Sequence, residues 1–426
     1  MTGGVIEPGW LTDRRLPADV LETPGLRAVM EALGSGEAAF LVGGAVRNAL
    51  LDTPPGDIDL ATPLLPEEVQ ARVIAVGLKC VPTGLDHGTI TVVSEGTGFE
   101  VTTFRADLET DGRRATVALG QGLAADAARR DFTMNALYAD AAGRVIDPLG
   151  GLPDIDARRL RFIGDATERI REDYLRILRF FRFHAWYADP EGGMDADGLA
   201  ACAAEAEGMA TLARERVGHE FRRLLAAADP APAMAAMEAA GILARCLPGA
   251  SAVPLAPLVH LERLAGRPAD WRTRLAAVMP VAGPGDASVA DTVEALRLSK
   301  AEGRALGAIA AARDRLAAGE DASASAYRHG AAATWAAMLI GEAHAGWRAD
   351  PPALAVGPGS VAAAIERGAS ARLSLRAADL TAAGLSPGPD IGEALAAAEE
   401  AFIASGFTLD KAALLSHGLA KVGHKG

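Results

Sequence analysis

The order of hydrophobic and polar residues divides the chain into an amino-terminal part with strands and helices and a longer part with helices alone. Short or alternating apolar runs, which are typical of strands, occur at 40–42, 56–60, 81–93 (a turn leading into a strand) and 99–105. Helical spacing of apolar residues predicts amphipathic helices at 18–33 and 65–76. After residue 150 only helical periodicity of Ala, Leu, Glu and Arg remains, interrupted by Gly and Pro.

Two aspartates stand one residue apart in the run Gly56–Leu60. Residues i and i+2 of a strand point to the same face, so we expect Asp57 and Asp59 to project together. Carboxylate oxygens are the ligands that Mg²⁺ prefers. A hairpin through 99–105 could place Glu100 beside them as a third carboxylate, and an exposed strand glutamate is the alternative.

The first apolar run ends at two glycines, after which a helix is expected. Gly43 and Gly44 would let a phosphate approach backbone N–H groups at the start of that helix. Arg47 stands one turn into the helix and could add a charge-assisted bond to the phosphate. The polar, glycine-rich stretch 106–123 is predicted to be a mobile loop beside the same site.

Composition narrows the class of protein. The chain has 426 residues, 50% of them hydrophobic, enough for two to four domains with their own cores. No apolar run approaches the roughly eighteen residues of a membrane span, and three scattered cysteines predict neither disulfides nor a zinc site, so we expect a cytoplasmic protein without a membrane partner. The net charge of −13 argues against nonspecific RNA binding, so any RNA would have to be recognised by a local basic track or by its shape.

The segment Glu172–Arg182 combines an apolar side at helical spacing with an aspartate and three arginines that recur every three residues. Ion pairing along a solvated helix is one interpretation. A second follows from hydrogen bonding: Asp173 only accepts and Arg176 only donates. This pair complements cytosine and adenine, which present an amino donor beside a ring-nitrogen acceptor, and it would reject uracil and guanine.

Several of these motifs resemble one family. Phe40–Leu51 with Gly56–Leu60 resembles the head-domain signature of the class II tRNA nucleotidyltransferase and poly(A) polymerase family. Arg129–Leu137 matches the family's R-R-D-F-T-x-N-A-L motif at every fixed position, and Glu172–Arg182 matches its E-D-x-x-R element. Glu215–Arg223 matches the next element, with an arginine at 223 where lysine is commoner. The resemblance covers about residues 38–225, with a weaker similarity near 384–415.

The resemblance implies a fold, namely an α/β nucleotidyltransferase (polymerase-β-like) head with a small mixed sheet, followed by an all-α neck, body and tail. We expect the head at 1–150, a nucleotide-selecting neck at 151–228, a body at 229–345 and a tRNA-binding tail at 346–426. It also implies that Asp57 and Asp59 bind Mg²⁺ and are catalytic together with Glu100. The residues expected to bind the nucleotide are Gly43, Gly44, Arg47, Arg130, Asp131, Asn135, Asp173, Arg176, Arg179 and Arg182.

The implied activity is addition of C, C and A to tRNA 3′ ends from CTP and ATP, with pyrophosphate released. Its partners would be tRNA, ATP and CTP, and not DNA. A poly(A) polymerase with the same head is the close alternative, disfavoured by the hairpin at 83–89 and by a C-terminus without a polybasic tail. An A-only or CC-only enzyme and, more remotely, an inactive RNA-binding protein stay open.

Overall fold

The structure is a computed structural model of the chain. It describes residues 6–34, 38–54, 56–85, 88–110, 115–280, 287–346 and 360–423. Contacts divide the chain into two units, residues 1–248 and 249–426, and each unit is described by itself. In the described part of the chain, no helix is both long enough and apolar enough to cross a membrane.

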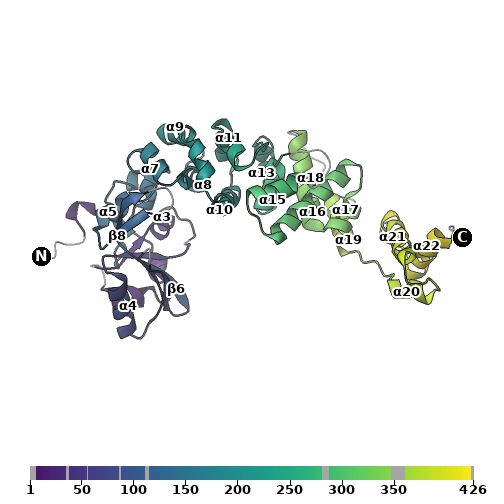
Figure 1. Cartoon of the computed structure of the whole chain (residues 1–426), viewed down its shortest axis with the longest axis horizontal. Helices are drawn as coiled ribbons and strands as arrows, with labels where there is room; N and C mark the ends of the chain where they lie inside the picture. Colours follow the sequence, from purple (N-terminus) through teal and green to yellow (C-terminus); the bar gives the residue numbers. More distant parts are fainter. Residues whose placement is uncertain are drawn as a thin grey trace. The chain divides into compact units, whose positions relative to one another are not determined.

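An eight-stranded sheet forms the amino-terminal part of the first unit (Figure 1). Its order is β1-β10-β9-β2-β3-β6-β5-β4. The strands are β1 (Leu11–Arg15), β2 (Phe40–Val42), β3 (Asp59–Thr62), β4 (Lys79–Gly84), β5 (Thr89–Ser94), β6 (Thr97–Thr103), β9 (Tyr138–Ala139) and β10 (Arg144–Ile146). Strands β3 and β6 are parallel and the other neighbours are antiparallel, so the predicted mixed sheet is confirmed.

The sheet is larger than the small sheet expected from sequence. The expected turn at 81–84 belongs to β4, an edge strand, where Pro82 costs no ladder hydrogen bond on the open side. Strand β1 is almost entirely exposed and β9 has two residues, so neither shows a hydrophobic alternation that could have been recognised.

The predicted loop at 106–123 is also wrong over most of its length. It contains a second, two-stranded sheet formed by β7 (Arg105–Thr110) and β8 (Ala115–Leu119), followed by the start of a helix at Leu123. Residues 111–114, the centre of the expected loop, lie outside the described residues. The same is true of residues 86 and 87 in the hairpin that argued for CCA addition.

Short helices pack around the sheet, and its core contains Phe40, Phe104 and Tyr138. They are α1 (Ala18–Leu21), α2 (Leu26–Leu33), α3 (Gly44–Leu50), α4 (Pro66–Ala75), α5 (Leu123–Ala128) and α6 (Leu152–Asp156). The helix predicted at 18–33 is split at Gly25, which has a φ of 82°. A Cβ there would lie 2.6 Å from the carbonyl oxygen of Ser94, so only glycine fits this approach of helix to sheet.

Helices complete the first unit: α7 (Ala166–Glu172), α8 (Leu175–Tyr187), α9 (Ala196–Ala204), α10 (Arg214–Leu225), α11 (Ala231–Ala239) and α12 (Ile242–Cys246). Helix α8 is joined to the sheet domain by buried aromatic rings. Phe132 packs on Phe162 at 4.9 Å and on Phe183 at 5.3 Å, and Phe162 stacks on Phe180 at 5.4 Å between ring centroids. Each such pair contributes roughly 0.5–1.5 kcal/mol beyond its buried area. This cluster fixes α8 opposite strand β3.

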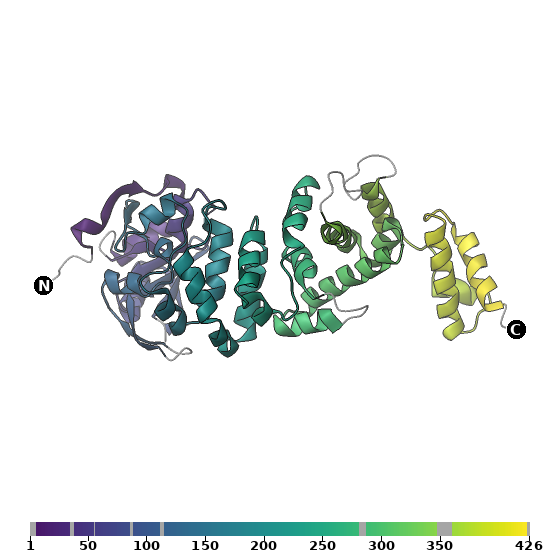
Figure 2. The ribbon, with the colours of Figure 1, turned by 90° about the horizontal axis from the view of Figure 1, so that it is seen from above.

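The second unit is helical in all the elements that the structure describes there (Figure 2). They are α13 (Leu255–Leu264), α14 (Trp271–Val278), α15 (Ala287–Ala295), α16 (Lys300–Ala317), α17 (Ala322–His329), α18 (Ala331–Ala345), α19 (Val361–Ser370), α20 (Ala377–Ala382), α21 (Pro389–Ala404) and α22 (Lys411–Gly423). The predicted helical remainder is therefore confirmed for the described residues. The finer division at residues 150, 228 and 345 stays a prediction.

Candidate active site

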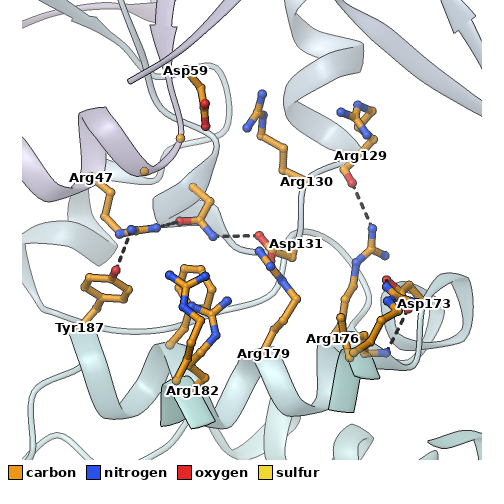
Figure 3. Close-up of a pocket in the computed structure, with 17 residues that line it drawn as sticks. Arg47, Asp59, Arg129, Arg130, Asp131, Asp173, Arg176, Arg179, Arg182 and Tyr187 are labelled. Carbon is orange, nitrogen blue, oxygen red and sulfur yellow. Dashed lines mark hydrogen bonds and ion pairs between the residues drawn. The ribbon is translucent and has the colours of Figure 1, made fainter. Parts of the chain in front are cut away.

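A pocket of about 440 Å³ lies within the first unit, between the sheet domain and helix α8 (Figure 3). All ten residues expected to bind a nucleotide line it, and so does Asp59. The full lining is Gly43, Gly44, Arg47, Asp59, Arg129, Arg130, Asp131, Asn135, Asp173, Leu175, Arg176, Arg179, Arg182, Phe183, Tyr187, Arg216 and Arg223. Asp59 enters from the sheet side, and the arginines of α8 enter from the opposite side.

Carboxylates gather on the sheet side, although not as predicted. Strand β3 begins at Asp59, so Asp57 precedes the strand and is exposed, and the prediction that both aspartates lie on one strand is wrong. Parallel pairing of β3 with β6 instead sets Glu100 directly opposite Asp59. Asp57 and Glu100 do not line the pocket itself.

The surroundings of Asp59 shift its pKa. Burial, together with charge repulsion by Glu100 and Asp57, raises its pKa from 3.8 to about 6, although Arg130 acts in the opposite direction. Among the described residues, no group of three or more His, Cys, Asp or Glu side chains could hold a metal ion without other ligands. Mg²⁺ rarely requires such a group, because it is usually held by one or two carboxylates together with substrate phosphates.

Arg47 is a buried connection between the glycine turn and α8. Gly43 has a φ of 64°, and a Cβ there would lie 3.2 Å from an Nη1 of Arg130. From α3, Arg47 donates to Asn135 Oδ1 and, at 2.8 Å, to Tyr187 Oη, and its guanidinium carbon lies 3.9 Å from the Tyr187 ring centroid. Burial lowers the pKa of Arg47 to about 10, so it stays charged at neutral pH.

Arg130 is held by a buried acid from the preceding helix. Asp126 Oδ2 accepts from Arg130 Nη2 at 2.9 Å and from Tyr138 Oη at 2.7 Å, and Arg129 donates to its other oxygen at 3.1 Å. Burial opposes ionisation of Asp126, but Arg130 and Arg129 outweigh it and lower the pKa from 3.8 to about 2. Asp126 therefore keeps both arginines fixed beside Asp59.

Asp131 is paired in the same way with a helix α8 arginine. Arg179 Nε donates to Asp131 Oδ2 at 2.6 Å, while Asn135 and the backbone N–H of Phe132 donate to Oδ1 at 2.9 Å. Burial opposes ionisation, but Arg179 and these donors lower the pKa of Asp131 to about 2. Asp131 and Asn135 therefore form a connected network with Arg47 and Arg179.

The pair predicted to read the base differs from the sequence-based expectation. Asp173 is not helical: it has extended backbone (φ −154°, ψ 104°) between α7 and α8. Its Oδ1 accepts from the N–H of Leu175 at 3.1 Å and its carbonyl oxygen accepts from the N–H of Arg176, so it forms a local turn just before α8, whose N-cap residue is Tyr174. Its Oδ2 accepts from Arg216 of α10 at 2.7 Å.

Arg176 also has partners within the protein. It donates from Nη1 to Glu172 and, at 2.6 Å, to the carbonyl oxygen of Arg169, and from Nη2 to the carbonyl oxygen of Arg129 at 3.2 Å. Arginine has five N–H hydrogens, so two remain after these three bonds. Each oxygen of Asp173 also keeps a free lone pair after its one contact. Both side chains can therefore contact a base without losing the bonds that hold them.

Arg182 has a buried partner as well. It pairs with Glu220 of α10, and the side chains are 4% and 5% exposed. Burial lowers the pKa of Arg182 and Glu220 opposes that effect.

Sequence reasoning missed Phe183 and Tyr187 as lining residues. Phe183 lies 4.3 Å from the guanidinium carbon of Arg182 and 5.0 Å from that of Arg179, so its ring separates like charges. Both aromatics continue the pocket-facing side of α8 at i+4 spacing from Arg179. Extending the helical pattern beyond residue 182 would have found them.

The charge balance of the pocket differs from that of the chain. Eight of its seventeen lining residues are arginines and three are aspartates, whereas the chain carries −13. The lining of the pocket is therefore rich in arginine, although several of these side chains pair with acids behind the lining, such as Asp126, Glu172 and Glu220.

Comparison with known proteins agrees with this arrangement. The Poly A polymerase head domain matches residues 39–161, and the probable RNA and SrmB-binding site of polymerase A matches residues 194–253. Over these residues the chain therefore resembles the tRNA nucleotidyltransferase and poly(A) polymerase family. The resemblance predicted from the sequence is thus confirmed.

Two curated relatives illustrate the similarity. The chain is 42% identical over 216 residues to the CCA-adding enzyme of Geobacillus thermodenitrificans, covering 50% of this chain and 52% of the relative. It is 38% identical over 207 residues to the human mitochondrial CCA tRNA nucleotidyltransferase 1, covering 48% of each. The chain spans about half the length of the curated relatives it matches.

Solved structures extend the likeness over nearly the whole chain. The Bacillus stearothermophilus CCA-adding enzyme in complex with CTP superposes with a TM-score of 0.70 at 27% identity, covering 93% of this chain and 98% of that one. The Thermotoga maritima CCA-adding enzyme complexed with tRNA has a TM-score of 0.65 at 18% identity and shares the fold, covering 96% and 98%.

Proposed function

We propose that the chain is a template-independent CCA-adding tRNA nucleotidyltransferase, which adds C, C and A to tRNA 3′ ends from CTP and ATP and releases pyrophosphate. The observation that carries the proposal is the single pocket that joins Asp59 to the acceptor Asp173 and the donor Arg176 among eight arginines. Named relatives with CCA-adding activity support it.

In this proposal, Asp57 and Asp59 hold Mg²⁺, and Glu100 adds a third negative charge beside them. The donor set fits, because oxygen ligands suit this ion and the carboxylates of Asp59 and Glu100 stand opposite each other on paired strands. Mg²⁺ bound there would activate the tRNA 3′-hydroxyl and stabilise charge developing on the α-phosphate. Gly43 and Gly44 leave room for the triphosphate because they carry no side chains.

The other pocket residues bind and select the nucleotide. Arg130, Arg179 and Arg182 neutralise phosphate charge, and Arg47 orients Asn135 beside Asp131 for the ribose. Asp173 accepts from the exocyclic amine of C or A, and the remaining hydrogens of Arg176 donate to the ring nitrogen. Uracil and guanine would place like groups opposite both residues and leave them unpaired, which is costly in a buried site.

The helical neck, body and tail keep their proposed roles, with the tail binding tRNA, and we propose a cytoplasmic location. The three cysteines support a reducing compartment, since none forms a disulfide and two are buried.

The test uses purified protein with tRNAs ending before CCA, after C and after CC, each given CTP, ATP or both. We expect three residues to be added to the first substrate and none beyond the terminal A. An unstructured RNA serves as the control. Long A tails made on it faster than tRNA is repaired would favour poly(A) synthesis instead.

A further inference from the structure

Arg169 lies on α7 outside the pocket lining, yet it connects the two segments that form the pocket. Its side chain is only 12% exposed. Nη2 donates to the backbone carbonyl oxygen of Arg129 and, at 2.8 Å, to that of Arg130. Nη1 donates to Glu172 Oε1 at 2.7 Å. One guanidinium thus binds the sheet-domain segment and the end of α7 together.

Arg176 shares two of these acceptors, Glu172 and the carbonyl oxygen of Arg129. It donates to Glu172 Oε2, to the carbonyl oxygen of Arg169 and to the carbonyl oxygen of Arg129. Glu172 therefore accepts from Arg169 with one oxygen and from Arg176 with the other. Removing Arg169 would free Glu172 to turn and would release the Arg129 carbonyl that Arg176 shares.

We propose that Arg169 is a positioning residue for base selection, which fixes the guanidinium of Arg176 relative to the segment that carries Arg130 and Asp131. The inference rests on the proposed function and names a determinant of its nucleotide specificity. The planar guanidinium of Arg169 is suited to this role, because its N–H groups bind three acceptors from two segments at once. A lysine presents a single point charge and cannot span them.

A purely structural role for Arg169 makes a different prediction. If Arg169 only anchored α7, its loss would lower the free energy of unfolding and affect all nucleotides alike. If it positions Arg176, its loss changes the preference for CTP over UTP. The preference for CTP over UTP is therefore the measurement that separates the two roles. The free energy of unfolding is measured alongside it.

The experiment compares Arg169→Met and Arg169→Lys with Arg171→Met as the matched control. Arg171 lies on the same helix, is 61% exposed and pairs with Glu205 at the surface, so its loss should change little. For each full-length variant, kcat/KM for CTP and UTP on tRNA lacking CCA and the equilibrium binding of both nucleotides are measured. Thermal unfolding is followed in parallel.

We expect Arg169→Met to reduce the preference for CTP over UTP at least about tenfold, the scale of one charged hydrogen bond, mainly through KM. Arg169→Lys should remain folded and still lose most of the preference. Glu172→Gln should have a similar effect, and the double variant Arg169→Met/Glu172→Gln should be no worse than either single one, because the two act as one unit.

The inference would be overturned if folded Arg169 variants kept the wild-type preference for CTP over UTP. It would also be overturned if the effects of the Arg169 and Glu172 substitutions on this preference multiplied in the double variant. Should Arg169→Met fail to fold, Arg169→Lys decides alone. If the wild-type protein transfers no nucleotide, the proposed function fails, and the binding preference for CTP over UTP still tests Arg169.

Discussion

Asp59 and Asp126 are neighbours of the same arginine, yet their environments shift their pKa values in opposite directions. Asp126 is enclosed by Arg129, Arg130 and Tyr138, and its pKa falls to about 2. Asp59 is half-buried beside other carboxylates, and its pKa rises to about 6. The first acid is fully paired within the fold, whereas Arg130 offsets burial and charge repulsion at the second only in part. The sheet side of the pocket therefore keeps negative charge that its own residues do not neutralise, whereas the helix side is preorganised by internal pairs.

The largest effect on activity is expected at the carboxylates that we propose bind Mg²⁺. Asp59→Ala should reduce nucleotide incorporation at least about a thousandfold, because it removes a proposed ligand of the ion that provides several kcal/mol of transition-state stabilisation. Steady-state incorporation of CTP over a range of Mg²⁺ concentrations measures it. Asp57→Ala should behave in the same way, and Glu100→Ala should cost less. Robust Mg²⁺-dependent activity in Asp59→Ala would remove the carboxylates from the metal site.

On the helix side, breaking an internal pair should affect stability. Glu220→Ala leaves Arg182 buried without its partner, and we expect a loss of about 3 kcal/mol in the free energy of unfolding. Urea denaturation measures this loss. Glu205→Ala, which breaks the surface pair with Arg171, is the control and should cost less than about 1 kcal/mol. Equal costs in the two variants would contradict the view that the helix side depends on buried pairing.

The smallest effect is the pH dependence that Asp126 contributes. Its pKa is lowered from 3.8 to about 2 in the folded state, so its stabilisation is complete above pH 4 and is lost as the pH falls toward 2. The shift corresponds to about 2 kcal/mol. The difference in unfolding free energy between wild type and Asp126→Asn should therefore narrow by that amount between pH 5 and pH 2. A difference that stays constant with pH would show that Asp126 is not stabilised by its arginines.

Local pattern and matched motifs were enough to predict many of the residues that line the pocket. The glycine turn after β2 and the arginines of α8 are visible as periodicity and spacing, and Asp131 and Asn135 belong to a motif that could be matched. What could not be predicted depends on contacts between distant segments. The sequence allowed a hairpin to bring Glu100 beside the aspartates. That it lies directly opposite Asp59 follows from the parallel pairing of β3 with β6, two strands that are far apart in the sequence.

The position of Asp173 was wrong for a related reason. The segment 172–182 has helical periodicity, but Asp173 is extended, accepts from the N–H of Leu175 and pairs with Arg216, so α7 ends before it. Aspartate often forms such local turns, and this signal was present in the sequence. The role of Arg169, by contrast, depends on backbone carbonyl groups of a distant segment, which no side-chain pattern reveals.

We propose that the two sides of the pocket divide the work, with chemistry at Asp59 and base selection at Asp173 and Arg176. Measuring transfer and binding of CTP and UTP for Asp59→Ala and Asp173→Ala side by side tests this division. Asp59→Ala should transfer nothing and still bind CTP in preference to UTP. Asp173→Ala should transfer at a reduced but measurable rate and lose about tenfold of the preference, because the exocyclic amine has lost its acceptor. Loss of the preference in Asp59→Ala, or full preference in Asp173→Ala, would contradict the division.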